Sequence, residues 1–498
     1  MQTNQNWVLN PDYRFKADLD RICMYSGEKT EYDSTPDWES YIHPYQAAIL
    51  MLFDGSREAG EVLREISTHF GITYDCALKL IEPYMGNETP IYTEWGGNKV
   101  SFPKNVLIRK EKINGDLPDR SFPDFDFDMN NVNLDNDRAH RAPHSMMWML
   151  TSRCVTNCAY CYADKKTPYN PLTTERALEI IDDAHRLGMK FINVIGGEVF
   201  LRKDWEVLIR RIIDYGMMPA FISTKMPVSE EILQKLVSTG YSNVIQISLD
   251  SVDEDILAST INVKKGYLSD LMEGVRRLDA AGFEIQIDTI LTKDTATKEG
   301  LDALAVFLST IRHFKYWEIR VPEFTPYSSE GFRKVMASRT QLREIESYVR
   351  NELMERFGRK IIFSAEPMNE RFGCTGPEEP CFSGGQCGFL RSQMFVLPDG
   401  KVSACEQLYW HPEFIIGDLA KNSIEEVWQS SRALKVFNYS RDMYREESQC
   451  VKCKVFDACN TKKRRCVVKV IKAYGVRNWD YPDPRCVYAP DFKETLKY

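Results

Sequence analysis

A repeated order of helix, glycine and strand between residues 145 and 326 constrains the fold more than any other feature. The helical pattern at 174–187 has one apolar face and ends before Gly188, and the patterns that end before Gly240 and Gly282 follow the same order. Parallel strands joined by helices need right-handed crossovers, so we predict an α/β fold with a partial (β/α)6 barrel of the TIM type. The predicted strands are 146–151, 191–195, 220–223, 244–249, 284–291 and 317–321.

The chain is long enough for several domains, and its composition changes along its length. In the N-terminal part, strand-like runs at 7–9 and 21–25 precede helical patterns at 44–53, 58–70 and 74–85. A hairpin with short helices behind it is a winged-helix-like arrangement. Residues 111–143 are rich in Asp, Asn, Pro and Arg, and we expect a linker that wraps over the following domain. The expected domains are 1–105 (winged-helix-like), 106–143 (linker), 144–330 (barrel), 331–373 (connecting segment) and 374–498 (cysteine-rich).

Charge and the N-terminal sequence limit the expected partners. The net charge of −8 and the pI near 5.6 argue against binding to nucleic acid or to an anionic membrane. The first residues are polar and are not followed by the apolar segment of a signal peptide. The longest apolar runs, such as 47–53, are too short to span a membrane. We therefore expect a cytoplasmic protein with no nucleic-acid and no membrane partner.

The cysteines are clustered, which indicates metal ligands. The sequence has 14 cysteines, and a cytoplasmic protein rarely uses them as disulfides. Three lie between residues 154 and 161 and nine lie between 374 and 486. Such clusters are typical of metal or iron–sulfur sites, whereas the isolated Cys23 and Cys76 are more typical of small buried apolar residues.

Cys154, Cys158 and Cys161 have the spacing C-x3-C-x2-C directly after the first predicted strand. Three thiolates can bind three irons of a [4Fe-4S] cluster and leave the fourth iron open to another ligand. A zinc site usually has four protein ligands, and the nearest histidine, His144, precedes the strand. We therefore favour an iron–sulfur cluster over zinc.

This motif, with an aromatic Tyr160 before the third cysteine, resembles that of the radical S-adenosylmethionine (SAM) superfamily. Gly196-Gly197-Glu198, after the second predicted strand, is similar to the Gly-Gly-Glu motif of the same superfamily. The resemblance implies that the open iron binds SAM, and that SAM is cleaved to methionine and a 5′-deoxyadenosyl radical. That radical abstracts a hydrogen atom from the substrate.

The resemblance also implies which residues contact SAM. The glycines allow the backbone to approach the ligand, and the Glu198 carboxylate would accept from the methionine ammonium. Ligands gather at the carboxyl ends of parallel strands, so polar residues there would meet the ribose and the carboxylate of SAM. The same residues could instead be ordinary loop caps. The expected SAM contacts are Tyr160, Gly196, Gly197, Glu198, Ser223, Ser248 and Asp250, with Thr224 and Lys225 as further candidates at the end of the third strand.

The C-terminal cysteines resemble the SPASM domain, an extension of radical SAM enzymes that carries auxiliary clusters. The segment 395–405 is similar to its hairpin, although the gap between Cys459 and Cys466 is longer than usual. Three [4Fe-4S] clusters are then expected in all; paired zinc sites are the alternative. The resemblance implies Cys387, Cys405 and Cys466 as ligands of cluster I, completed by Cys381, and Cys450, Cys453, Cys459 and Cys486 as ligands of cluster II.

Residues 1–100 resemble the peptide-recognition (RRE-like) domain of enzymes that modify ribosomally made peptides. A DNA-binding winged helix would need a basic recognition helix, yet the pattern at 74–85 holds one lysine and two acids. With all three regions together, the chain resembles a radical SAM/SPASM maturase of ribosomal peptides. The resemblance implies a precursor peptide whose leader binds the N-terminal domain, and an external electron donor such as flavodoxin or ferredoxin.

The expected reaction is a thioether bond between a Cys sulfur and a carbon of the precursor. The alternatives are a carbon–carbon or carbon–oxygen crosslink, and oxidation of a protein Cys or Ser as in the sulfatase maturases. An iron–sulfur protein that never cleaves SAM is a further alternative, against which Gly196-Gly197-Glu198 argues. The sequence identifies no catalytic acid or base.

Overall fold

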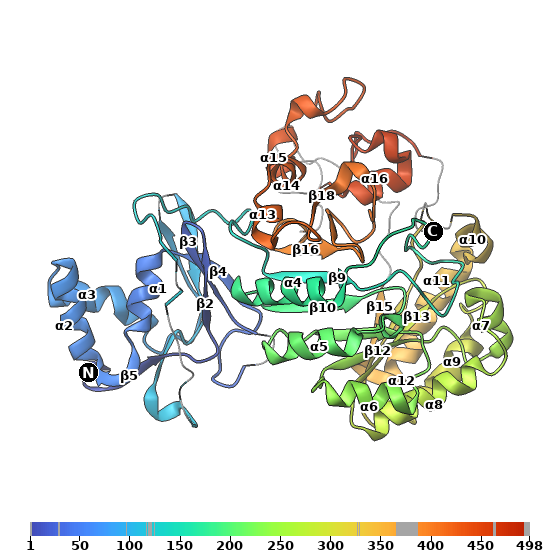
Figure 1. Ribbon diagram of the computed structural model, residues 1–498, viewed down its shortest axis with the longest axis horizontal. Helices are drawn as coiled ribbons and strands as arrows, with labels where there is room; N and C mark the ends of the chain where they lie inside the picture. Colours follow the sequence, from blue (N-terminus) through green and yellow to red (C-terminus); the bar gives the residue numbers. More distant parts are fainter. Residues whose placement is uncertain are drawn as a thin grey trace. The chain divides into compact units, whose positions relative to one another are not determined.

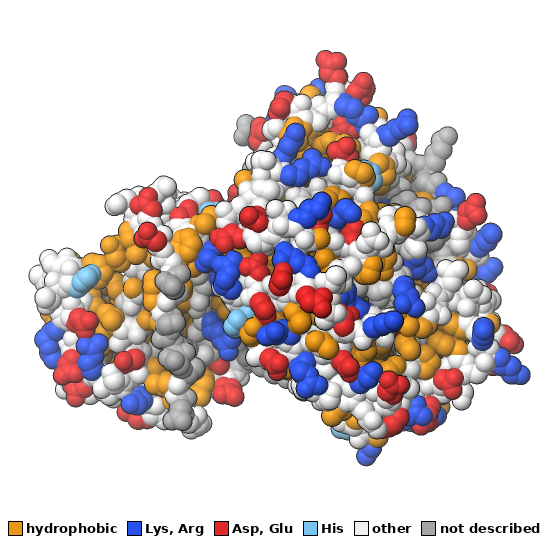
Figure 2. All heavy atoms as spheres, viewed as in Figure 1, with side chains coloured by type: hydrophobic (Ala, Val, Ile, Leu, Met, Phe, Trp, Pro, Cys, Tyr) orange, Lys and Arg blue, Asp and Glu red, His pale blue; other side chains and the backbone are white. Residues whose placement is uncertain are grey.

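The chain forms two compact units in the computed structural model (Figure 1). The first comprises Met1–Pro143 with Arg186–Lys190, and the second comprises His144–His185 with Phe191–Tyr498. The structure describes residues 2–27, 30–95, 97–115, 117, 122–123, 125–325, 327, 329–364, 387–461 and 465–492. Acidic and basic side chains are mixed over the face that Figure 2 shows.

Small antiparallel sheets make up much of the first unit. One sheet has the order β2-β3-β4, a second has the order β5-β1-β8, and β6 pairs with β7. The strands are β1 (Asn6–Leu9), β2 (Arg14–Asp18), β3 (Arg21–Tyr25), β4 (Glu39–Ile42), β5 (Asp54–Glu58), β6 (Ile91–Trp95), β7 (Asn98–Phe102) and β8 (Leu107–Arg109).

The hairpin of this unit is formed by β2 and β3, and the prediction that 7–9 would pair with 21–25 is wrong. Strand β1 pairs with β5 and β8 instead. In the β2–β3 register, Asp18 faces Arg21, so Leu19 and Asp20 form a two-residue turn. Leu19 has a φ of 57°, a conformation that such turns require and that glycine or asparagine usually supplies. Because neither residue is present, the sequence carried no turn signal at this point.

Three short helices follow β4 close to the predicted positions. α1 (Pro44–Met51) begins with a capping box in which His43 and Gln46 bond to each other's backbone. α2 (Ala59–Phe70) ends at Gly71 in the left-handed conformation, and α3 (Tyr74–Ile81) is capped by Thr73. Their apolar faces join the strands in one core, which includes Leu50, Leu63, Ile66, Ala77 and Ile81.

The segment before the barrel is tied to the β2–β3 hairpin. The fully buried Arg21 donates to the Asp18 carboxylate over 2.9 Å and to the carbonyls of Asp135 and Arg138. Asp18 in turn accepts from the backbone amides of His140 and Arg141. A buried ion pair is stable only when its remaining hydrogen bonds are satisfied, and the segment supplies them. Residues up to Pro143 therefore belong to the first unit.

The second unit is built on one sheet, which confirms the predicted α/β fold. Among the described residues the sheet has 10 strands, in the order β15-β14-β13-β12-β11-β10-β9-β16-β17-β18. Strands β9 to β14 pair in parallel and follow the predicted strands within a few residues. They are β9 (Ser145–Met149), β10 (Phe191–Ile195), β11 (Phe221–Thr224), β12 (Val244–Ser248), β13 (Ile285–Ile290) and β14 (Phe314–Arg320).

The sheet extends beyond the predicted strands at both ends. β15 (Ile361–Ser364), from the segment expected only to connect domains, adds in parallel to β14. At the other end, β16 (Gln393–Val396) adds in parallel to β9, and β17 (Lys401–Ser403) and β18 (Ile415–Asp418) continue antiparallel. The hairpin expected from the SPASM resemblance is β16–β17, so the cysteine-rich region shares the barrel's sheet.

Helices connect the parallel strands and lie along the outside of the sheet in Figure 1. Their apolar faces cover buried residues such as Ile247, Ile287 and Trp317, which alternate with polar residues along the strands. The connecting helices are α4 (Thr174–Arg186), α5 (Trp205–Asp214), α6 (Glu230–Ser238), α7 (Glu254–Ile261), α8 (Tyr267–Ala280) and α9 (Lys298–Leu308). Within the described residues, no helix has the length and apolar character needed to cross a bilayer.

After β14, α10 (Ser329–Val335) and α11 (Arg339–Tyr348) lead toward β15, and further helices follow β18. These are α13 (Ile424–Trp428), α14 (Ser431–Phe437), α15 (Phe456–Thr461) and α16 (Val467–Tyr474). Cys450 and Cys453 lie between α14 and α15, Cys459 lies in α15, Cys466 directly precedes α16, and Cys486 follows it.

Candidate active site

The cysteine loop, residues 152–162, follows strand β9 and brings three thiols together. The hydroxyl of Thr156 lies 3.3 Å from the sulfur of Cys154 and 3.3 Å from the sulfur of Cys158. The Cys161 amide donates to the Cys158 carbonyl over 3.1 Å and turns the chain back. Burial raises the pKa of Cys161, and charges on Cys158 and Cys154 add to the rise, as expected for neighbouring sulfurs.

Gly196 and Gly197 pack with their backbone against this loop. The Gly197 amide donates to the Thr151 carbonyl over 2.7 Å, and the sulfur of Cys154 lies 3.4 Å from the Gly197 oxygen. A Cβ atom on Gly197 would lie 2.3 Å from the Arg153 oxygen, and one on Gly196 would lie 2.8 Å from the Thr151 oxygen. Only glycine allows this approach, so the two loops interlock through their backbones.

Glu198 is fully buried and connects the second strand to the third. One carboxylate oxygen accepts from the Thr224 hydroxyl over 2.9 Å, and the other accepts from the amides of Lys225 and Met226 over 3.0 Å each. Burial raises the pKa of Glu198 to about 7 despite these bonds. The carboxylate therefore holds the end of β11 in place through three hydrogen bonds. Its contact with SAM stays a prediction.

Tyr160 and Asp250, both expected to contact SAM, meet each other and Lys225. The Lys225 ammonium donates to the Tyr160 hydroxyl over 2.6 Å and to Asp250 over 2.9 Å. The Tyr160 hydroxyl also bonds to Asp250. The structure thus joins the cysteine loop to the ends of β11 and β12 through a buried ion pair.

Ser223 and Ser248 lie on the polar face of the sheet, and both are partly exposed. Ser223 is opposite Gln246, and Ser248 is opposite Asp288 in the parallel register. Neighbouring residues on the same strands, such as Ile247, point to the other face and are buried. The two serines therefore lie on the same face of the sheet as Gln246 and Asp288, and their contact with SAM stays a prediction.

The same interior face carries an ionic network that sequence reasoning missed. Arg320 Nη2 lies 3.0 Å from Asp288 and 2.6 Å from Glu318, so one guanidinium bridges acids of two strands. Gln286 donates to Asp288 over 2.7 Å, and Ser364 donates to Glu318 over 2.7 Å. Burial raises the pKa of Asp288 to about 6, although Arg320 opposes the rise. The alternating polar residues of β13 and β14 were the signal that could have revealed this network.

Further charged groups come from the SPASM region. Lys472 of α16 is almost fully buried and donates to Glu323, just after β14, over 2.8 Å. Glu406, next to Cys405, is half-buried, and its partial burial raises its pKa while charges on Arg320 and Lys472 lower it. Glu406 therefore lies among charged groups of the barrel and of α16.

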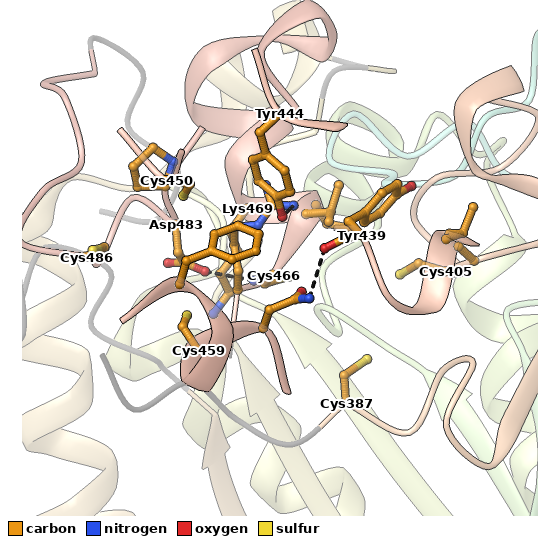
Figure 3. A pocket seen from close by; sticks show the side chains of 18 of the residues that line it. Cys387, Cys405, Tyr439, Tyr444, Cys450, Cys459, Cys466, Lys469, Asp483 and Cys486 are labelled. Carbon is orange, nitrogen blue, oxygen red and sulfur yellow. Dashed lines mark hydrogen bonds between the residues drawn. The ribbon is translucent and has the colours of Figure 1, made fainter. Parts of the chain in front are cut away.

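The C-terminal cysteines surround a cavity of about 400 Å³ (Figure 3). Tyr439, Tyr444, Phe456 and other apolar residues complete its walls. The lining cysteines are Cys387, Cys405, Cys450, Cys453, Cys459, Cys466 and Cys486. Cys381, expected to complete cluster I, and the leftover Cys374 lie outside the described residues.

The lining cysteines fall into two groups. Figure 3 shows Cys450, Cys459 and Cys486 apart from Cys387 and Cys405. Burial raises the pKa of Cys450 to about 12, and charges on Cys459 and Cys486 add to that rise. For Cys405, burial is again the main cause of the raised pKa, and Cys387 and Cys466 contribute. The assignment of these cysteines to two clusters stays a prediction.

Comparison with known families assigns two domains. The radical SAM superfamily matches residues 148–308, which include the cysteine loop and Gly196-Gly197-Glu198. The SPASM iron–sulfur cluster-binding domain matches residues 387–454. The chain contains a radical SAM domain and a SPASM domain. This confirms the resemblance found in the sequence.

Two curated relatives match 70% of the chain. Mycofactocin maturase MftC of Mycolicibacterium smegmatis is 24% identical over 359 residues, which are 70% of this chain and 84% of the relative. PqqA peptide cyclase of Granulibacter bethesdensis is 23% identical over 362 residues, 70% of this chain and 88% of the relative.

The likeness to solved structures extends over almost the whole chain. SuiB of Streptococcus suis, solved bound to its precursor peptide SuiA, covers 96% of this chain and 98% of its own chain. The TM-score is 0.60 at 13% identity, so the two proteins share a fold. The likeness includes the region N-terminal to the radical SAM domain.

The residues of the radical SAM domain fit a [4Fe-4S] cluster and SAM. Cys154, Cys158 and Cys161 would hold three irons, and the sulfurs of Cys154 and Cys158 already lie on either side of the Thr156 hydroxyl. In the SPASM domain the thiols enclose a volume, which suits clusters better than single zinc ions. Among the described residues, no group of three Cys, His, Asp or Glu side chains could hold a single metal ion.

Proposed function

We propose that this radical SAM enzyme forms thioether bonds, Cys sulfur to carbon, in a ribosomally made precursor peptide. The observation that carries the peptide substrate is the likeness to SuiB over 96% of the chain, since that structure holds a precursor peptide. The relatives named as a maturase and as a peptide cyclase support the same substrate class.

The N-terminal unit would bind the leader of this peptide. Its sheet β2-β3-β4 has β2 and β4 as outer strands, and an extended peptide can add to such an edge through main-chain hydrogen bonds. Deletion should end at Pro143, because Arg21 and Asp18 tie residues 135–141 to the hairpin. Without residues 1–143, we expect loss of peptide modification but continued SAM cleavage without product. Full processing of the peptide by the shortened enzyme would refute leader binding.

Three [4Fe-4S] clusters are proposed. Cys154, Cys158 and Cys161 hold the cluster that binds SAM, and an external donor such as flavodoxin or ferredoxin reduces it. Cluster I has the ligands Cys387, Cys405 and Cys466 with Cys381, and cluster II has Cys450, Cys453, Cys459 and Cys486. The two cysteine groups around the cavity support this division.

When bound, SAM and its cluster would supply the abstraction of a hydrogen atom from an unactivated carbon. The auxiliary clusters would accept the one electron that remains after the carbon–sulfur bond forms. The chain's own residues must then remove the proton of the substrate thiol. Asp288 and Glu406 are the acids whose pKa burial raises near Arg320, and such shifts are typical of proton acceptors. Arg320 holds Asp288 in place on the polar interior face.

The product tests the proposal. Each thioether removes two hydrogens, so the precursor should lose about 2 Da per linkage, and the bonded sulfur should resist iodoacetamide because alkylation needs a free thiolate. Deuterium on the acceptor carbon should appear in 5′-deoxyadenosine. A loss of 2 Da with every Cys still alkylated would favour a carbon–carbon or carbon–oxygen crosslink. A Cys or Ser converted without any crosslink would indicate an oxidation like that of the sulfatase maturases.

A further inference from the structure

Arg320 is the last residue of β14, and two carboxylates fix one of its nitrogens. Its Nη2 lies 2.6 Å from Glu318 of the same strand and 3.0 Å from Asp288 of β13. Asp288 also accepts from the Gln286 amide over 2.7 Å. Glu318 also accepts from the Ser364 hydroxyl over 2.7 Å. The guanidinium therefore has a fixed orientation at the carboxyl end of its strand, where parallel barrels bind their ligands.

The other two nitrogens of this guanidinium have no hydrogen-bond partner within the described residues. Nε is enclosed by protein atoms, whereas the Arg320 side chain as a whole is 44% exposed. Nη1 is therefore the nitrogen that a bound molecule can reach. Because an arginine carries five N–H donors in a planar fork, a bond from Nη1 leaves the bonds of Nη2 undisturbed.

The interior face of the sheet is open around Arg320. Glu318 lies on that face two residues before Arg320, and Ser364 of β15 is the register partner of Arg320. Both are partly exposed, whereas Trp317 and Ile319 point to the opposite face and are fully buried. A closed barrel fills its interior with side chains, which would bury all of these residues. Among the described residues this part of the interior is not filled, so an extended substrate segment can enter beside Arg320.

The charges around Nη1 decide which kind of group it can bind. One guanidinium pairs with two carboxylates, those of Asp288 and Glu318. The next acid along the chain, Glu323, has its own cation, since Lys472 lies 2.8 Å away. Carboxylates thus outnumber the cation, and they repel a ligand carboxylate or phosphate. A neutral acceptor is not repelled, and every residue of a peptide carries one in its main-chain carbonyl.

We propose that Arg320 Nη1 donates to a main-chain carbonyl of the precursor peptide and holds the core segment, the part that is modified, beside Asp288. The inference rests on the proposed peptide substrate and adds a substrate-binding residue to it. A bond to the main chain orients the reacting residue without requiring a particular neighbouring side chain. Since Arg320 also holds Asp288, the proposed acceptor of the thiol proton, one side chain positions both the substrate and the base.

The test is the binding of a synthetic core segment, without its leader and acetylated and amidated at its ends, to the reconstituted full-length enzyme with SAM and without a reductant. Arg320→Lys keeps a cation between the two acids but has no second nitrogen. Its Kd should rise about tenfold, as expected for the loss of a bond from a charged donor. The rising limb of the pH profile of crosslinking should not move in Arg320→Lys, because the charge beside Asp288 is kept. Arg312→Lys, an exposed arginine just before β14, should change neither quantity.

Ester analogues of the core segment identify the contacted carbonyl. An ester carbonyl is a weaker acceptor than an amide carbonyl, so an ester at the contacted bond should weaken binding to the wild type but not to Arg320→Lys. Circular dichroism and iron content check the fold, and if Arg320→Lys fails them, Arg320→Gln takes its place in the ester series. An unchanged Kd for Arg320→Lys, or equal ester effects in both enzymes, would overturn the proposal and leave the peptide substrate intact. A wild type that binds neither the core segment nor the whole precursor would refute the proposed function, and this inference with it.

Discussion

Gly197 lies so close to Arg153 that a Cβ atom on the glycine would come within 2.3 Å of the arginine's carbonyl oxygen. The carbonyl belongs to the backbone of the cysteine loop, so it cannot move without displacing Cys154. We expect Gly197→Ala to prevent the loop from closing and to remove the iron of the SAM cluster, measured by iron analysis and by 5′-deoxyadenosine formation. Gly216→Ala is the matched control: its φ is 72° but no atom lies within 4 Å, so only backbone strain of ~1 kcal/mol is expected. Equal iron contents in the two variants would contradict the interlocking of the loops.

Replacing Cys154, Cys158 and Cys161 together with Ala should abolish 5′-deoxyadenosine formation under dithionite. Without its thiolates the loop cannot hold a cluster with an open iron, whereas the SPASM cysteines lie elsewhere and should keep their iron. Circular dichroism checks the fold, and iron analysis checks the remaining clusters. SAM cleavage at the wild-type rate would refute the assignment of this loop.

Three clusters predict about twelve iron atoms per reconstituted chain. Cys405→Ala should reduce this number by about four, because cluster I loses one of its ligands. Cys76→Ala, an exposed cysteine of α3, should leave the iron content unchanged. Tightly bound zinc with little iron in anaerobically prepared protein would show that the SPASM region holds zinc.

Peptide modification should depend on the charge state of Asp288. Its folded pKa is raised to about 6 by burial, so a proton acceptor at this position becomes active as the pH rises through about 6. Arg320→Gln removes the cation that lowers this pKa, and the rising limb of the pH profile should move to higher pH. Asp288→Asn should lose crosslinking but keep SAM cleavage. If Glu406→Gln has this phenotype and Asp288→Asn does not, Glu406 is the acceptor.

Protonated His140 should stabilise the N-terminal unit, and this stabilisation should be lost at high pH. Its ring lies 2.9 Å from Asp20 and 3.6 Å from Asp135. Burial alone lowers the pKa of His140, but Asp135 and Asp20 raise it to about 9. A folded pKa above the unfolded value of about 6.5 gives stability that is complete below pH 6.5 and is lost as the pH rises through 9.

We expect His140→Gln to cost ~2 kcal/mol at pH 6 and little at pH 10. Hydrogen exchange of residues 14–25 measures the opening free energy of the hairpin at each pH. A cost that does not change with pH would show that His140 acts only through packing.

How much the sequence predicted differs between the two units. In the barrel, helices with an apolar face alternate with glycines and short apolar strands, and this local pattern placed β9 to β14 within a few residues. In the first unit the turn at Leu19 and Asp20 carries no glycine, so β2 and its pairing with β3 were missed. The sequence placed a boundary at residue 143, but it did not show that the segment before it belongs to the first unit, because that depends on Arg21 reaching carbonyls more than 100 residues away.

The sequence by itself determined the chemistry: the C-x3-C-x2-C spacing, Gly196-Gly197-Glu198 and the C-terminal cysteines identify the radical SAM and SPASM domains. Thiolate spacing and glycine are local properties, and a motif displays them directly. Only the tertiary structure decided which groups act together. Lys225 and Asp250 lie 25 residues apart and meet Tyr160 because parallel strands bring their carboxyl ends to one edge of the sheet. Asp288 and Glu318 share Arg320 for a related reason, since register sets neighbours across strands.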